Sequence, residues 1–224
     1  AELTRLLRAI RGAGLISPSL FLSVLKHAEG PALEAAAESV RAGWRPSAAE
    51  ARGLVERLPA DARALIEKAG DEARERLTRY ETLLDGGDPR RGRDVFFGQK
   101  VACGGCHAVG AQGGRVGPDL TKIGQIRAGR DLLESILLPS STFAQGYDAY
   151  LVLSRDGDVR TGVIAAQSAD SILLRDAGGA ETRLNRSTIR ELKRAEKSVM
   201  PEGLERALSD DEFRDLLAFL RSLK

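Results

Sequence analysis

The chain has 224 residues, of which 42% are hydrophobic and 29% charged, a balance typical of a folded globular protein and not of a disordered one. Its 34 basic and 32 acidic residues are well mixed, which argues against nucleic acid as the main partner, and no apolar run reaches the roughly 18 residues that a membrane span requires. Aromatic residues are only 4%, and the chain has one Met, two Cys and two His.

The first 86 residues place apolar side chains at the three- and four-residue spacing of amphipathic helices. Proline residues interrupt this pattern at intervals, at positions 18, 31, 46 and 59. Helices are expected over residues 33–44 and 48–58, with a longer helix after Pro59. Because helix and break alternate several times, residues 1–86 are predicted to form a helical, HEAT-like region.

Asp85-Gly-Gly-Asp-Pro89 is the strongest linker signal in the chain. A short helix expected over residues 90–98 follows it and leads to Cys103-Gly-Gly-Cys106-His107, which holds both cysteines and one of the two histidines. Residues 108–129 contain six glycines and are predicted to be a loop wrapped around another group. A further helix is expected over residues 130–138, ended by Pro139.

From Tyr147 the apolar period changes from 3.6 to 2. Asp156-Gly157 is a hairpin turn signal, and strands are expected over 159–165, 171–175 and 181–184 after a first strand that starts near Tyr147. Residues 147–193 are therefore predicted to form a small antiparallel meander or barrel. Helix returns at the end of the chain, where Ser209 and Glu212 form a predicted capping box.

The Cys-x-x-Cys-His motif has three interpretations. It is the attachment sequence of c-type haem, in which two thiols bond the haem vinyl groups and the adjacent histidine binds the iron. It could also be a thioredoxin-like dithiol, which requires a βαβ context that the flanking helix and glycine loop do not provide. A structural zinc site would need a second pair of ligands, and the other histidine, His27, lies in a different predicted domain.

A haem iron with a second axial ligand would most simply use Met200, the single methionine, in a polar non-periodic segment before the last helix. Core filling is the alternative role for a lone methionine. His107 and Met200 are 93 residues apart, but 46 remain when residues 147–193 are set aside. That separation suits a compact single-haem domain, so the β segment is interpreted as an insertion.

These motifs resemble class I cytochromes c, and in detail the planctomycete-type haem-binding CxxCH domain. The resemblance rests on Gly92-x-x-x-Phe96, the Cys-x-x-Cys-His motif, Gly117-Pro118-Asp119-Leu120, the segment from Leu132 to Ser140, Gly146-Tyr147, Asp156-Gly157 and Met200-Pro201-Glu202-Gly203-Leu204. It covers about residues 88–224. It implies a chain that is mainly α with a β insertion: a helical region over 1–86, then an all-α cytochrome c domain over 88–224, interrupted at 147–193.

The resemblance also implies roles for single residues. Cys103 and Cys106 would hold one haem c covalently, His107 and Met200 would bind its iron, and the carbonyl of Pro118 would accept a hydrogen bond from the His107 ring. Leu120 would pack on the haem face. Phe96 would line the haem, and Gly92 and Phe96 would cross Phe219 of the last helix. Arg115 could pair with a haem propionate, although a solvated loop arginine is an equal alternative.

The expected function is single-electron transfer and not catalysis, with electrons arriving from a redox partner or a fused dehydrogenase module. A haem sensor or peroxidase-like enzyme with an open distal site is a second hypothesis, weakened because no distal histidine or acid is evident. A binding module with a structural haem is a third. Haem c is attached outside the cytoplasm, so a periplasmic or exported protein is expected. The chain starts at Ala1 without a leader sequence, so either a leader has been removed or the chain is part of a longer polypeptide.

Overall fold

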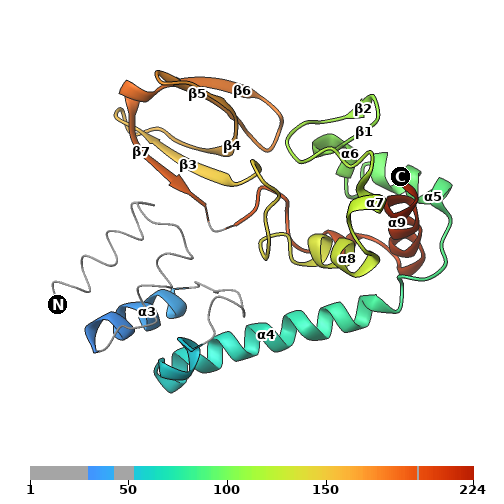
Figure 1. Cartoon of the computed structure of the whole chain (residues 1–224), viewed down its shortest axis with the longest axis horizontal. Coiled ribbons are helices and arrows are strands. Elements are labelled where there is room, and N and C mark those ends of the chain that lie inside the picture. Colours follow the sequence, from blue (N-terminus) through green and yellow to red (C-terminus); the bar gives the residue numbers. More distant parts are fainter. Residues whose placement is uncertain (1–29, 43–52, 196) are drawn as a thin grey trace. The chain divides into compact units, whose positions relative to one another are not determined.

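A computed structural model describes residues 30–42, 53–195 and 197–224 (Figure 1). The helices expected before residue 30, His27 and most of the break around Pro46 lie outside the described residues. The chain divides into two compact units, Ala1–Glu75 and Arg76–Lys224. The division falls inside one helix and upstream of the predicted linker. The predicted domains, 1–86 and 88–224, stay a prediction.

The described part of the first unit is helical. Helix α3 (Pro31–Arg41) ends near the expected position, and the short 3-10 helix η1 (Val55–Arg57) occupies part of the segment in which an α-helix was expected. Arg41 donates hydrogen bonds to Asp61 at 2.6 Å and to Glu34 at 2.7 Å, which joins α3 to the start of α4 (Ala60–Glu81). The apolar core of this unit consists mainly of small side chains: Ala35, Ala36, Ala37, Val40, Leu54, Leu58 and Ala62.

Three helices enclose the main core of the second unit: α5 (Pro89–Phe97), α8 (Gly129–Leu137) and α9 (Asp210–Ser222). Each starts where the sequence predicts, and the predicted capping box of α9 is confirmed, since Ser209 and Glu212 hydrogen-bond each other's backbone. Each helix presents one apolar face to the others. The buried core residues contributed by α5, α8 and α9 are Phe96, Leu132, Leu133, Ile136, Leu137, Phe213, Leu216, Leu217, Phe219 and Leu220.

Helices α5 and α9 lie side by side and cross at Gly92 (Figure 1). A Cβ on Gly92 would overlap the carbonyl oxygen of Asp215 and approach the Cβ of Phe219 to 2.8 Å. The rings of Phe96 and Phe219 are 5.4 Å apart, so the predicted crossing is confirmed. Arg91 donates to the buried carboxylate of Asp215 at 2.6 Å beside the crossing, and this bond holds the pKa of Asp215 below its usual value.

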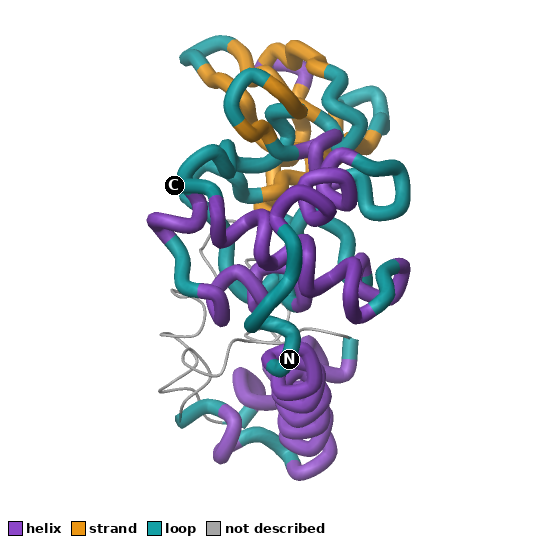
Figure 2. The backbone as a smooth tube through the Cα atoms, turned by 90° about the vertical axis from the view of Figure 1, so that its right-hand side faces the viewer, coloured by secondary structure: helices purple, strands orange, loops and turns teal. Residues whose placement is uncertain are grey.

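The strands form a larger part of the fold than expected. Strands β3 (Ala149–Ser154), β4 (Val159–Gln167), β5 (Ser171–Arg175), β6 (Glu181–Asn185) and β7 (Ile189–Arg194) make one antiparallel sheet in the order β6-β5-β4-β3-β7. Its apolar side packs around Val152, Ile172 and Leu174. The strands gather apart from the helices of the same unit (Figure 2).

The predicted fold class, mainly α with a small β meander or barrel, is therefore wrong. The described residues contain seven α-helices, α3 to α9, together with a five-stranded and a two-stranded sheet, so the chain is a mixed α and β protein. Strand β7 was missed because its apolar residues, Ile189 and Leu192, are three positions apart, a helical and not a strand spacing. It pairs with β3, although the register shifts at Leu153/Ser154.

No helix in the described ranges is both long and apolar enough to cross a membrane.

The crossing at Gly92 predicts that Gly92→Ala destabilises the second unit severely. A methyl group would meet the backbone of α9, which cannot move without disrupting the core, so we expect a loss of about 3 kcal/mol or more in the free energy of unfolding. Chemical denaturation followed by circular dichroism measures it. Gly70→Ala is the matched control: Gly70 is an exposed residue of α4 with open space around it, so alanine should stabilise by about 0.5–1 kcal/mol. Equal effects of the two substitutions would contradict the prediction.

Candidate functional site

The two cysteines lie on a single helical turn, α6 (Cys103–Cys106), that follows α5 closely. Ala102, which precedes the turn, has a left-handed backbone with φ of 45°, a conformation that is uncommon for a residue with a side chain. The amide of His107 then donates to the carbonyl of Cys103 at 2.9 Å and closes the turn. The motif is thus folded by its own local hydrogen bonds, and His107 leaves the turn in an extended conformation.

The glycine-rich segment folds back on this turn. Its backbone amides donate to carbonyls of the motif: Gly114 to Gly104 at 2.9 Å and Gly117 to Cys106 at 2.8 Å. A Cβ on Gly114 would overlap the carbonyl oxygen of Gly105, so the close approach requires glycine there. The segment also contains the short strands β1 (Ala108–Val109) and β2 (Gln112–Gly113) and the helical turn α7 (Ile123–Ile126).

The ring of His107 is held in one orientation. Its Nδ1 lies 2.8 Å from the carbonyl oxygen of Pro118, which is the predicted hydrogen bond. The ring packs against Gly117, where a Cβ would clash with the imidazole. Burial lowers the pKa of His107, and the hydrogen bond to Pro118 opposes this effect in part. With Nδ1–H donating to the carbonyl, Nε2 is left as a neutral lone-pair donor, the form of histidine that binds metals.

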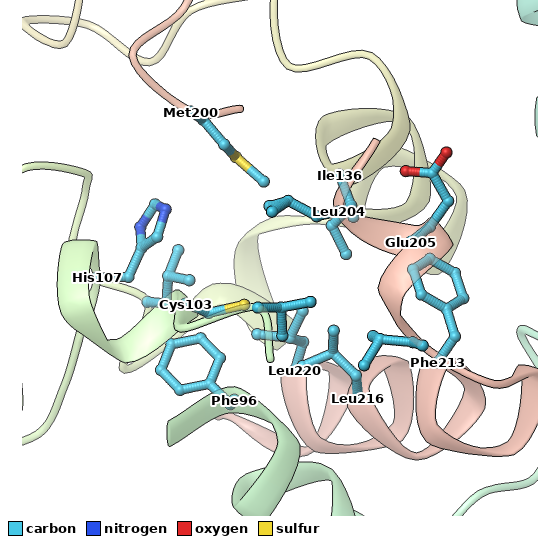
Figure 3. Close-up of a pocket in the computed structure, with 13 residues that line it drawn as sticks. Phe96, Cys103, His107, Ile136, Met200, Leu204, Glu205, Phe213, Leu216 and Leu220 are labelled. Atoms are coloured by element: carbon cyan, nitrogen blue, oxygen red, sulfur yellow. The ribbon is translucent and has the colours of Figure 1, made fainter. Parts of the chain in front are cut away.

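One cavity of about 50 Å³ lies next to this ring. Its walls are almost entirely apolar, and they come from α5, α6, α8, α9 and the segment between β7 and α9. Figure 3 shows His107, Cys103 and Met200 at one end of the cavity and Glu205 and Phe213 at the other. The lining residues are Phe96, Val101, Cys103, His107, Leu120, Ile136, Met200, Leu204, Glu205, Leu208, Phe213, Leu216 and Leu220.

The structure brings together most, but not all, of the residues predicted for the site. Five of them line the cavity: Phe96, Cys103, His107, Leu120 and Met200. Pro118 contributes its carbonyl to the His107 ring. Cys106 and Arg115 do not line the cavity.

The sheet reaches the site through the turn between β5 and β6, which sequence reasoning did not anticipate. The side chain of Arg175 donates to the carbonyl of Arg115 and pairs with Glu181. The Sγ of Cys106 lies 4.0 Å from the carbonyl oxygen of Ala177 in the same turn. The turn between β5 and β6 therefore lies beside the motif at Cys106, which does not line the cavity.

Glu205 is a second residue that the sequence analysis missed. It lies in the 3-10 helix η3 (Leu204–Ala207), is 2% exposed and lines the cavity, so the expectation that no acid faces the site is wrong. Arg76 donates to its Oε1 at 2.7 Å across 129 positions of the chain. The local signal was weak, because a glutamate beside Arg206 in a polar segment has the pattern of a solvated surface.

The structure bears on the alternatives for the motif. In the described residues, no group of three or more His, Cys, Asp or Glu side chains lies close enough together to hold a metal ion. The motif is flanked by helix α5 and by a two-residue strand, and a βαβ unit does not surround it in the described part of the chain. The donor groups that line the cavity are the Cys103 thiol, the His107 imidazole, the Met200 thioether and the Glu205 carboxylate, and the first three are of the kinds that a covalently attached haem uses.

The different environments of the two thiols predict different reactivities in the folded protein. Burial raises the pKa of Cys103 from 9.0 to about 11, which lowers its thiolate fraction at pH 8 about a hundredfold, and it raises the pKa of Cys106 in the same direction. We expect iodoacetamide to alkylate Cys106 well before Cys103, as measured by mass spectrometry of peptides. In denaturant the two rates should converge. Faster labelling of Cys103 in the folded protein would contradict this assignment.

The buried His107 ring predicts a pH dependence of stability in the haem-free protein. The folded state keeps the ring neutral below the unfolded-state pKa of about 6.5, so the unfolded state binds more protons there. The contribution of His107 to the free energy of unfolding is therefore complete above about pH 7 and is lost as the pH falls below 6.5. Urea denaturation between pH 8 and pH 5 measures it. His107→Gln should flatten this slope, and an unchanged slope would exclude His107 as its source.

The chain was also compared with known proteins. No protein-family model and no curated protein matches it. The function must therefore be argued from the residues and the geometry of the cavity.

Proposed function

We propose that the second unit is a c-type cytochrome module that carries single electrons and is not itself an enzyme. The observation that supports this best is the convergence of the Cys103 thiol, the His107 imidazole and the Met200 thioether at one apolar cavity (Figure 3). Cys103 and His107 are joined by a local turn, but Met200 comes from a segment 93 residues away in the sequence. Such convergence on an apolar space is expected for two axial ligands and an attachment thiol.

The residues fit haem in kind. Cys103 and Cys106 would form the thioether links, in which each S–H adds across one vinyl double bond, sulfur bonding one carbon and hydrogen the other, without an oxidant. His107, oriented by Pro118, and Met200 would bind the iron. Bound in this way, haem supplies a one-electron couple, and methionine ligation favours its reduced form. The apolar side chains of Phe96, Leu120 and the other lining residues would exclude water and keep solvent from the iron.

The volume of the cavity adds one requirement. About 50 Å³ is far below the several hundred Å³ of typical sites for organic cofactors. Met200 lies in an irregular segment between β7 and η3, whereas the wall formed by Phe96, Leu216 and Leu220 is the packed crossing of α5 and α9. We therefore propose that this segment moves outward to admit the macrocycle, while α5 and α9 stay in place.

The proposal extends to the setting of the protein. Two axial ligands leave no open position on the iron, so the module would exchange electrons with a redox partner or a fused dehydrogenase module. Because haem c is attached outside the cytoplasm, the mature module would be periplasmic or otherwise exported. Glu205 is an acid at the cavity, but it lies at the end opposite to His107, and so it offers little support for a peroxidase-like site (Figure 3).

The proposal is tested by producing the chain in the periplasm of cells that attach haem c. Purified protein should gain the mass of one haem, keep it on denaturation and give a pyridine haemochrome spectrum with a low-spin reduced form. Replacing Cys103 and Cys106 by Ala should abolish covalent attachment. A colourless product of unchanged mass would overturn the proposal, and a high-spin spectrum would favour the open-site alternative.

Met200 has its own test in the same holoprotein. Met200→Ala should keep the covalent haem, remove the methionine-to-iron charge-transfer band and lower the reduction potential, since the thioether favours ferrous iron. Leu204→Ala is the matched control, because Leu204 also lines the cavity but has no donor atom. If the band and the potential survive in Met200→Ala, Met200 is a core residue and not a ligand.

A further inference from the structure

Glu205 is an unusual residue for the wall of an apolar cavity. Its side chain is 2% exposed, and its Oε1 accepts a hydrogen bond from Nη2 of Arg76 at 2.7 Å. Its Oε2 is buried and has no hydrogen-bond partner in the described part of the chain. Buried carboxylates normally satisfy both oxygens, so a half-satisfied one needs an explanation beyond packing.

The two partners of the ion pair are not equally buried. The Arg76 side chain is 28% exposed and also donates to the carbonyl of Leu137 at 3.1 Å, whereas Glu205 is almost completely enclosed. Nε of Arg206 lies 3.8 Å from Oε1 of Glu205, and the Arg206 side chain is 77% exposed. Solvent therefore screens both positive charges more than the negative one. The negative charge of Glu205 at the cavity wall is therefore only partly compensated by the positive charges of Arg76 and Arg206.

Stability alone does not account for this arrangement. Desolvating a carboxylate costs several kcal/mol, and apolar replacements of buried ion pairs are often neutral or stabilising. A leucine at position 205 would continue the apolar wall formed by Leu204, Leu208 and Leu216 without that cost. The charge itself, and not the volume of the side chain, is the feature to be explained.

We propose that Glu205 is a charge-tuning residue whose buried carboxylate lowers the reduction potential of the redox group held in the cavity. The inference rests on the proposed function, because it needs a haem bound between Cys103, His107 and Met200. A buried carboxylate in the wall of the same apolar cavity, even at the end opposite to His107, would stabilise the additional positive charge of the oxidised group more strongly than water-exposed groups do. Arg76 keeps the carboxylate in place.

The expected effect opposes that of the axial methionine. Met200 favours the reduced iron, and Glu205 favours the oxidised iron. The redox group would therefore have an intermediate reduction potential, set by two residues five positions apart: Met200 in the irregular segment after β7 and Glu205 in η3. A residue that acts only by packing would change stability without changing the redox equilibrium.

The test is the reduction potential of Glu205→Gln in the purified holoprotein, measured by spectroelectrochemistry. Glutamine keeps the size of the side chain and an acceptor for Arg76 but removes the charge. We expect the equilibrium to shift about tenfold toward the reduced form, which is about 59 mV for a one-electron couple. The methionine-to-iron charge-transfer band should persist, which shows that the ligands are unchanged.

Glu202→Gln is the matched control. Glu202 is an exposed acid three positions before Glu205, so solvent screens its charge. Its potential should stay close to that of the parent protein. If Glu205→Gln does not fold, the double variant Arg76→Gln with Glu205→Gln removes both charges of the ion pair. We then expect a smaller upward shift of the reduction potential, because the charge of Glu205 is better buried than that of Arg76. Haem-loaded variants without an upward shift would overturn the role of Glu205 and leave the proposed function intact. A parent protein without haem would overturn both.

Discussion

The structure of the second unit depends on the contact of two helix backbones at Gly92. Because this residue has no side chain, α5 lies against the carbonyl of Asp215, and Phe96 meets Phe219 one turn further along. That contact places Phe96 of α5 and Leu216 and Leu220 of α9 on one wall of the cavity. Arg91 supports it by pairing with the buried Asp215 carboxylate at 2.6 Å. A larger residue at position 92 would separate the helices and open this wall.

The wall of the cavity beside the cysteine turn is built in a different way. The cysteine turn and the glycine segment are held by backbone hydrogen bonds between residues that are close in sequence, such as Gly117 to Cys106 at 2.8 Å and Leu120 to Ala108 at 2.8 Å. The site thus joins an apolar helix crossing to a short-range, hydrogen-bonded loop, and the irregular segment between β7 and η3 adds Met200 to the cavity. This segment has the least regular structure of the three, which suits it to adjust to a bound group.

The parts of this site that local chemistry determines could be predicted from the sequence. The Ser209 capping box and the helix limits near Pro89 and Pro139 follow from residue types a few positions apart, whereas the hydrogen bond between His107 and Pro118 was implied by the resemblance to class I cytochromes c. Strand β7 and Glu205 could not be predicted in this way. The first depends on pairing with β3, whose neighbours lie some 40 residues away, and the second on Arg76, 129 positions away. Neither β3 nor Arg76 can be identified as a partner from the local pattern of charged and apolar residues around β7 or Glu205.

The sheet is a second case in which the local sequence pattern does not determine the position of an element in the fold. Its sequence has no cysteine, histidine or other residue of evident chemistry, so four of its five strands could be predicted but the position of the sheet in the unit could not. The structure puts the turn after β5 against the glycine loop, where Arg175 binds the carbonyl of Arg115 while its guanidinium is paired with Glu181. The same loop is tied to the cysteine turn through Gly114 and Gly117. The sheet is therefore linked through the glycine loop to the backbone beside Cys106, although none of its side chains lines the cavity.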